Sequence, residues 1–102
     1  MTIQSAHGAG DDVVHNLAEQ RFESAVGGEL AVAEYQMRGK RMVFTHTEVP
    51  AAYQGRGIGS RLARAGLEYA RANGLRVVPL CPFIKAYIKR YPEFEGLTSG
   101  RW

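Results

Sequence analysis

The chain has 102 residues, enough for one folded domain and too few for a second of ordinary size. Apolar residues make up 45% and charged residues 23%, which predicts a small folded core, and the net charge of +3 suits an anionic ligand without indicating nucleic acid by itself. No apolar run approaches the roughly 20 residues needed to span a bilayer, and the single cysteine excludes an internal disulfide. We therefore expect a soluble cytoplasmic protein that does not associate with membranes.

The first half of the chain predicts strands. Residues 1–12 are polar and are expected to form a flexible N-terminal tail. Three strands follow, over residues 13–24, 29–38 and 41–49, with turns at Gly27-Gly28 and Gly39-Lys40. Strands joined by tight turns form an antiparallel meander. In the third strand, the two-residue period places four side chains on one face: Met42, Phe44, His46 and Glu48.

The second half predicts two helices and one more strand. A long helix is expected after the glycine segment 54–59, with Asn73-Gly74 as its stop signal. Residues 75–80 predict a buried strand beside the third one, which completes a strand–helix–strand crossover. Pro82 is expected to begin the second helix, and Pro92 to close it. The apolar face expected for this second helix consists of Phe83, Ala86, Tyr87 and Tyr91.

The glycine segment Gln54-Gly55-Arg56-Gly57-Ile58-Gly59 is the strongest functional signal. A helix N-terminus attracts phosphate, glycines let the backbone approach a ligand, and Arg56 adds a charged donor. The segment lacks the lysine of a P-loop, and its third glycine comes one residue early for a dinucleotide-binding fingerprint. A plain glycine-rich turn into a helix is the alternative that the glycines alone leave open.

The wider pattern points to a family. Gln54-x-x-Gly57-x-Gly59 resembles the pyrophosphate-binding signature of the GNAT superfamily of N-acetyltransferases, in which the first residue is Gln or Arg and the last is Gly or Ala. Its setting is similar, because it follows a strand expected to carry a bulge near Val49-Pro50 and opens a long helix. Four further segments resemble a subgroup of very small GNAT-like proteins: His46-Thr47-Glu48-Val49-Pro50, Ala70-Arg71, Val78-Pro79 and Cys81-Pro82-Phe83. Members of this subgroup lack most of the first strand and the early helices of the full fold. The resemblance covers residues 13–97.

The resemblance implies a minimal GNAT-like fold of α+β (α/β) class, with an antiparallel three-stranded meander followed by strand, helix, strand and helix, in a single domain over residues 13–102. It implies acetyl-CoA (coenzyme A) as cofactor, with the pantetheine arm in a gap where the third and fourth strands splay apart. The residues that it assigns to the cofactor are Thr47, Val49, Gln54, Gly55, Arg56, Gly57, Ile58, Gly59 and Ser60.

Four side chains are candidates for the chemistry of acetyl transfer. His46 and Glu48 project from one face of the strand expected to line the gap, and either is a candidate general base. Tyr87 resembles the GNAT tyrosine that protonates the departing sulfur. Cys81 stands where a helix begins, which can make a thiol nucleophilic, and the small GNAT-like subgroup carries a cysteine here. A structural histidine, a core tyrosine and an inert buried cysteine are the alternatives.

The leading interpretation is an acetyl-CoA-dependent N-acetyltransferase whose acceptor amine is a protein lysine, an N-terminus or a small amine. The alternative is a coenzyme A-binding protein with little or no catalytic activity. A small basic nucleic-acid module is the weakest interpretation, because the basic residues form no single stripe. No metal site is expected, and we expect a monomer or a weak homodimer.

Overall fold

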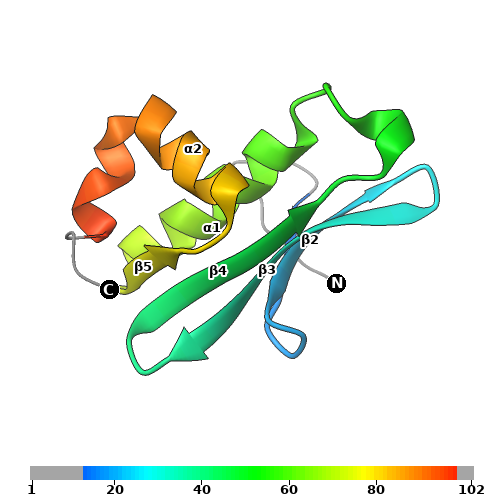
Figure 1. Ribbon diagram of the computed structural model, residues 1–102. Helices are drawn as coiled ribbons and strands as arrows, with labels where there is room; N and C mark the ends of the chain where they lie inside the picture. The colour runs from blue at the N-terminus through cyan, green and yellow to red at the C-terminus, as the bar shows by residue number, and fades with distance from the viewer. Residues whose placement is uncertain (1–12, 99–102) are drawn as a thin grey trace.

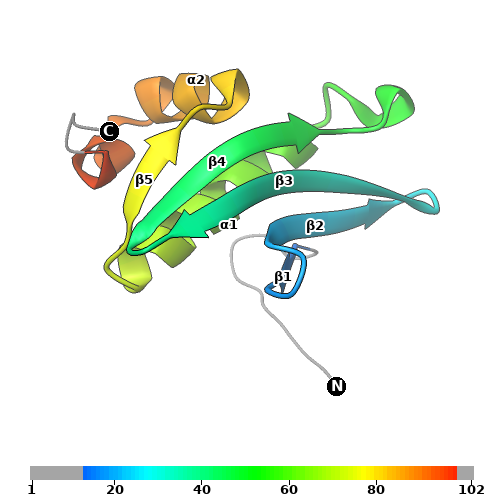
Figure 2. The same ribbon diagram turned by 60° about the horizontal axis from the view of Figure 1, so that its bottom comes forward.

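The computed structural model describes residues 13–98. The predicted tail, residues 1–12, and the last four residues of the predicted domain lie outside this range. Five strands form one sheet in the order β1-β2-β3-β4-β5. Both α-helices pack on one face of this sheet, and the other face is uncovered by the described residues (Figures 1 and 2). The fold class predicted from the sequence, α+β with a meander followed by a crossover, is confirmed.

The predicted first strand is wrong, because residues 13–24 contain a turn. Strands β1 (Val14–Asn16) and β2 (Arg21–Val26) pair antiparallel, with His15 opposite Phe22. The turn ends at Gln20, a non-glycine residue with a positive φ of 54°. Its conformation is supported by hydrogen bonds that its carbonyl and its side chain accept from β3, from Tyr35 and Met37 N–H. No glycine or proline marks this turn, so the composition gave no warning of it.

Strands β3 (Glu29–Arg38) and β4 (Arg41–Glu48) agree with the predicted second and third strands to within one residue. Their pairing slips by one residue, since Tyr35 lies opposite Phe44 while Glu34 lies opposite His46. The extra residue, Thr45, forms a β-bulge, and its hydroxyl donates to the Glu34 carbonyl at 3.4 Å. The bulge therefore lies inside β4 and not near Val49-Pro50 as predicted.

The bulge also corrects the predicted face of this strand. Met42 and Phe44 point into the core and are fully buried. After Thr45 the alternation is reversed, so Thr47 lies opposite the buried Ala33 and occupies the helix-covered face. His46 and Glu48 consequently lie on the uncovered face of the sheet. The four residues predicted to share one face are divided into two pairs.

Helix α1 (Ile58–Ala72) begins and ends where the sequence predicts, with Gly74 just beyond its end. Its buried face includes Leu62 and Leu67, and Gly66 allows the ring of Phe44 to approach the helix backbone. Strand β5 (Arg76–Pro79) runs parallel to β4 and forms the far edge of the sheet, as expected for a crossover. The helix thus joins two parallel neighbouring strands and covers their shared face.

Helix α2 (Pro82–Arg90) begins at the predicted proline, and a 3-10 helix, η2 (Pro92–Leu97), follows it. Its buried residues are Ile84, Tyr87 and Ile88, whereas Phe83 and Ala86 are exposed. The predicted face is therefore wrong in part: Tyr87 is buried as expected, but Ile84 and Ile88 are buried beside it in place of Phe83 and Ala86. Phe94 in η2 is fully buried and belongs to the core. No helix among residues 13–98 is long and apolar enough to cross a membrane.

Candidate functional site

The site lies where β4 and β5 separate. Their pairing runs from Arg41 opposite Arg76 to Phe44 opposite Pro79, and the last contact is a 3.0 Å hydrogen bond from Cys81 N–H to the Phe44 carbonyl. Beyond this point β5 ends, and its chain turns into α2. In the part of the chain that the structure describes, residues 45–48 of β4 thus have no strand partner on this side, and neither does Val49 after it. The strands splay as the sequence analysis expected.

The N-terminus of α1 opens into this gap. Gly57 is the N-cap with φ 81°, and Gly55 has φ 82°, a left-handed conformation that side chains other than glycine adopt only with strain. No described side chain caps the helix, and its first turn contains no acidic residue. The first helical hydrogen bond runs from Arg61 N–H to the Gly57 carbonyl, so the N–H groups of residues 58–60 have no helical acceptor. Such a terminus is suited to bind phosphate.

A cavity of about 480 Å³ lies between this terminus and the unpaired end of β4. It is lined by the glycine segment, by two β4-end residues and by two aromatic side chains: Thr47, Val49, Tyr53, Gln54, Gly55, Gly57, Ile58, Gly59, Ser60 and Phe83. Eight of the nine residues that the sequence assigned to the cofactor are in this lining, and Arg56 is the exception. The uncapped helix N-terminus and a lining that reaches from Ser60 of α1 to Thr47 of β4 fit a phosphorylated ligand with a long flexible arm.

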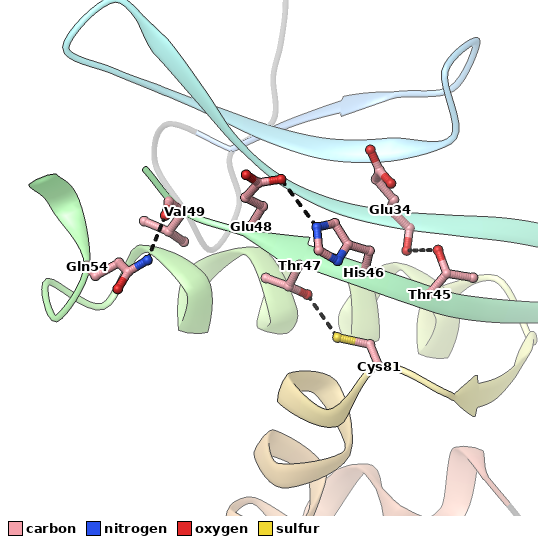
Figure 3. Close-up of polar contacts among 8 residues, drawn as sticks. All are labelled: Glu34, Thr45, His46, Thr47, Glu48, Val49, Gln54 and Cys81. Atoms are coloured by element: carbon pink, nitrogen blue, oxygen red, sulfur yellow. Dashed lines mark hydrogen bonds and ion pairs between the residues drawn. The ribbon is translucent and has the colours of Figure 1, made fainter. Parts of the chain in front are cut away.

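The loop before α1 is held in place by two contacts. The Gln54 side-chain amide donates to the Val49 carbonyl at 3.0 Å (Figure 3). Tyr53, in the 3-10 helix η1 (Ala51–Tyr53), packs so closely on Gly27 of the β2–β3 turn that a methyl group there would overlap its hydroxyl. Arg56 extends over the Tyr53 ring with 5.4 Å between the guanidinium carbon and the ring centre. The signature glutamine therefore fixes the loop against the end of β4.

Gly59 lines the cavity and also makes room for a neighbouring side chain. It has helical backbone geometry, and a methyl group at this position would lie 2.8 Å from the Phe83 ring. The missing side chain of Gly59 therefore makes room for Phe83 from α2. This ring is 41% exposed although it is apolar. Phe83 lies at the boundary of the cavity, where the first turn of α2 approaches the first turn of α1.

Thr47 and Cys81 meet at the splay. The Thr47 hydroxyl and the Cys81 sulfur are 3.4 Å apart and point toward one another (Figure 3). Cys81 is the N-cap of α2 and only 3% exposed, so Thr47 separates it from the cavity. The structure thus brings the predicted nucleophile next to a predicted cofactor-binding residue.

His46 and Glu48 lie on the other side of β4 from Cys81 (Figure 3). Their side chains are 56% and 70% exposed, and the imidazole Nε2 lies 3.2 Å from the carboxylate. Both belong to the strand segment that borders the gap, but they face the uncovered side of the sheet. The two base candidates are therefore brought together with each other, and not with the cavity.

Tyr87 is separated from the other candidates. Its hydroxyl accepts a hydrogen bond of 3.3 Å from Arg64 Nη1 of α1, and the same guanidinium lies near Glu68 and Glu93. Hydrogen bonding to Tyr87 is the main cause that raises the pKa of Arg64. Tyr87 lines a second, smaller cavity of about 150 Å³ and not the larger one.

Sequence reasoning missed three residues: Tyr53, Phe83 in its role as a boundary, and Arg64. Tyr53 and Phe83 are each within a few positions of a predicted site residue, and this proximity was the only signal that they gave. Among residues 13–98 there is no group of three or more His, Cys, Asp or Glu side chains that could hold a metal ion.

Comparison with known proteins gives a consistent result. The family model described as GCN5-related N-acetyl-transferase matches residues 21–97. The chain is 39% identical over 83 residues to the mouse and human proteins named NATD1, which covers 78% of this chain and 76% and 74% of theirs. Zebrafish NATD1 is 34% identical over 88 residues, covering 83% of this chain and 80% of that protein. In fold, the chain is similar to the NMR structure of a GCN5-like protein from Staphylococcus aureus, with a TM-score of 0.67 and 24% identity, over 83% of this chain and 84% of that one.

Proposed function

This chain belongs to the GCN5-related N-acetyltransferase family, and we propose that it is an acyltransferase that moves an acetyl group from acetyl-CoA to an amine. The observation that carries the proposal is the uncapped N-terminus of α1, which opens into a cavity that ends at the splayed strands. Bound there, acetyl-CoA supplies a thioester as the acetyl donor. The N–H groups of residues 58–60 hold its pyrophosphate, and the β4 end at Thr47 and Val49 orients its arm.

The acceptor amine comes from the uncovered face of the sheet in this proposal. His46 and Glu48 border the gap from that face, and their 3.2 Å contact lets the carboxylate orient the imidazole. The amine nitrogen bonds to the acetyl carbon as the carbon–sulfur bond breaks. Its proton passes to His46 or to water, and the leaving sulfur takes up a proton. Thr47 lines the acyl end and Cys81 lies buried behind it. Tyr87, whose hydroxyl accepts a hydrogen bond from Arg64, is assigned to helix packing.

A coenzyme A-binding protein with little catalysis is the second candidate. One observation favours it: the four candidate catalytic side chains do not converge on a single point. His46 and Glu48 are exposed on one face, Cys81 is buried behind Thr47, and Tyr87 lines another cavity. The two functions share the cofactor site and differ only in whether an amine is acetylated, so one experiment tests the site and a second tests turnover.

The cofactor site is tested by calorimetric titration of acetyl-CoA into the native chain and the Gly57→Trp variant. Gly39→Trp is a matched control, because Gly39 also has a positive φ and open surroundings, but lies in the β3–β4 turn. We expect saturable binding to the native chain and the control, and none to Gly57→Trp. Equal binding by both variants would exclude the glycine segment as the site, and no binding to the native chain would refute the proposal.

Turnover is tested by release of free coenzyme A in the presence of lysine-containing peptides, peptides with a free N-terminus and small amines. If acetyl-CoA binds but no acceptor class leads to release of free coenzyme A, the second candidate is favoured. Release that depends on His46 would favour the first. The His46→Gln variant keeps a hydrogen-bonding side chain at this exposed position, so its loss of activity reports on proton transfer and not on folding.

A further inference from the structure

The two cavities are neighbours and share two lining residues, Ser60 and Phe83. The larger cavity extends from these residues to Thr47, at the splayed strands. The smaller one extends from them along the groove between α1 and α2, where its other lining residues are Ala86, Tyr87, Arg90 and Tyr91. Ser60 and Phe83 thus divide one continuous depression into a long part and a short part.

The orientation of a ligand in this depression follows from the proposed function, on which this inference rests. With the acyl group beside Thr47 and the pyrophosphate at the N-terminus of α1, the remaining end of coenzyme A lies beyond Ser60. That end is an adenosine with a 3′-phosphate, which is an aromatic ring system next to a charged group. The smaller cavity is the part of the depression that such an end would reach.

The chemistry of the smaller cavity suits this end. Arg90 is the one cationic side chain in its lining, and it makes no ion pair with any carboxylate among residues 13–98. Its guanidinium lies 5.7 Å from the centre of the Tyr91 ring. The Arg64 guanidinium, by contrast, is engaged by Tyr87, Glu68 and Glu93. Phe83 adds an exposed aromatic ring at the entrance.

We infer that the groove between α1 and α2 is the subsite for the nucleotide end of the cofactor, with Arg90 binding the 3′-phosphate and the ring of Phe83 contacting the base. Guanidinium groups pair well with phosphate oxygens, and exposed aromatic rings stack on bases. Arg90 is then a specificity residue that distinguishes coenzyme A from thiol carriers without this phosphate.

The test is a set of binding titrations that need no turnover. Coenzyme A, dephospho-coenzyme A and 4′-phosphopantetheine are titrated into the native chain, Arg90→Gln and Lys89→Gln. Lys89 is a matched control, because it lies in the same last turn of α2 and does not line the cavity. We expect the native chain and Lys89→Gln to bind coenzyme A about fivefold more tightly than the dephospho form, as one charge-assisted contact at an exposed site predicts. Arg90→Gln should bind the two equally.

Phe83→Leu supplies a second measurement. It should weaken binding of coenzyme A and its dephospho form alike, and affect 4′-phosphopantetheine less, because that ligand has no base. Equal affinity of the native chain for coenzyme A and its dephospho form would overturn the subsite and leave the proposed function intact. The same conclusion would follow if Arg90→Gln kept the native ratio of these two affinities. Failure of the native chain to bind any of the three ligands would overturn both.

Discussion

Gly59 and Gly66 lie on the buried face of the same helix, and a methyl group at either would meet a phenylalanine ring at 2.8 Å. The two rings differ in their freedom to move. Phe44, opposite Gly66, is fully buried in the core, whereas Phe83, opposite Gly59, is 41% exposed. We therefore predict that Gly66→Ala destabilises the protein and that Gly59→Ala does not.

The magnitudes follow from two opposing terms. Replacing glycine by alanine inside a helix stabilises by up to about 1 kcal/mol. Overpacking a core costs about 1–3 kcal/mol, and Gly66→Ala would also approach Phe22, at 3.4 Å. Because two buried rings are approached, the cost is expected in the upper part of that range, about 2–3 kcal/mol. After the helix gain is subtracted, the net loss is about 1–2 kcal/mol, or a fall in Tm of about 5–15 °C for a chain of this size. For Gly59→Ala, the Phe83 ring rotates toward solvent, and the stability is unchanged or rises by up to about 1 kcal/mol.

Urea denaturation of the native chain and both variants measures these differences, and a Phe44→Leu background tests their cause. In that background the ring is gone, so Gly66→Ala should lose much of its effect. Coenzyme A titration adds a functional readout, because Phe83 lines both cavities and its displacement in Gly59→Ala should weaken binding. The reasoning would be refuted if Gly66→Ala were as stable as the native chain, or if Gly59→Ala were destabilised as much as Gly66→Ala.

Three further predictions concern single side chains. If the amine attacks the acetyl group directly, Cys81→Ser should keep turnover, and mass spectrometry should find no acetylated Cys81 in the native chain. An acetylated Cys81 together with an inactive Cys81→Ser variant would contradict direct attack. Arg64→Gln should lower stability by about 1 kcal/mol in urea denaturation, since its ion pairs are partly exposed; the same loss in a Tyr87→Phe background would show that the Tyr87 contact contributes nothing. Burial lowers the pKa of His15 from its usual value of 6.5, so below that pH the unfolded chain binds a proton that folded His15 resists, and stability falls. The Tm of His15→Gln should fall less than that of the native chain between pH 7.5 and 5.5, and parallel curves would contradict this.

The sequence predicted those elements whose signals are local. Helix α1 combines a regular apolar spacing with a glycine segment before it and Asn73-Gly74 after it, and all three signals agree. The splay of β4 and β5 followed from the family resemblance, which placed the cofactor's arm in the gap between them. The cavity itself lies between the end of β4 and α1. The lining of this cavity matches the predicted cofactor residues because one short segment, residues 54–60, supplies most of them.

The errors arose where the backbone departs from a regular period without a marking residue. Gln20 adopts a positive φ, which is usually found at glycine, so nothing in the sequence predicted the turn between β1 and β2. The bulge at Thr45 is a question of register between two strands, and a single strand cannot reveal it. For that reason, the prediction that His46 and Glu48 share a face with Met42 and Phe44 was wrong.

Because of the extra residue at Thr45, β4 contributes to the core in its first half and to the candidate site in its second half. Before it, the inward side chains Met42 and Phe44 belong to the core, and their substitution would affect folding. After it, the inward position passes to Thr47 at the cavity, and the ionisable pair is turned to solvent. Because the side chains of His46 and Glu48 are mostly exposed, these two residues can be replaced, in evolution or in the laboratory, at little cost in stability. If the same sequence paired without the bulge, regular alternation from Phe44 would turn His46 and Glu48 toward the helices, so this one irregularity keeps the reactive surface separate from the core.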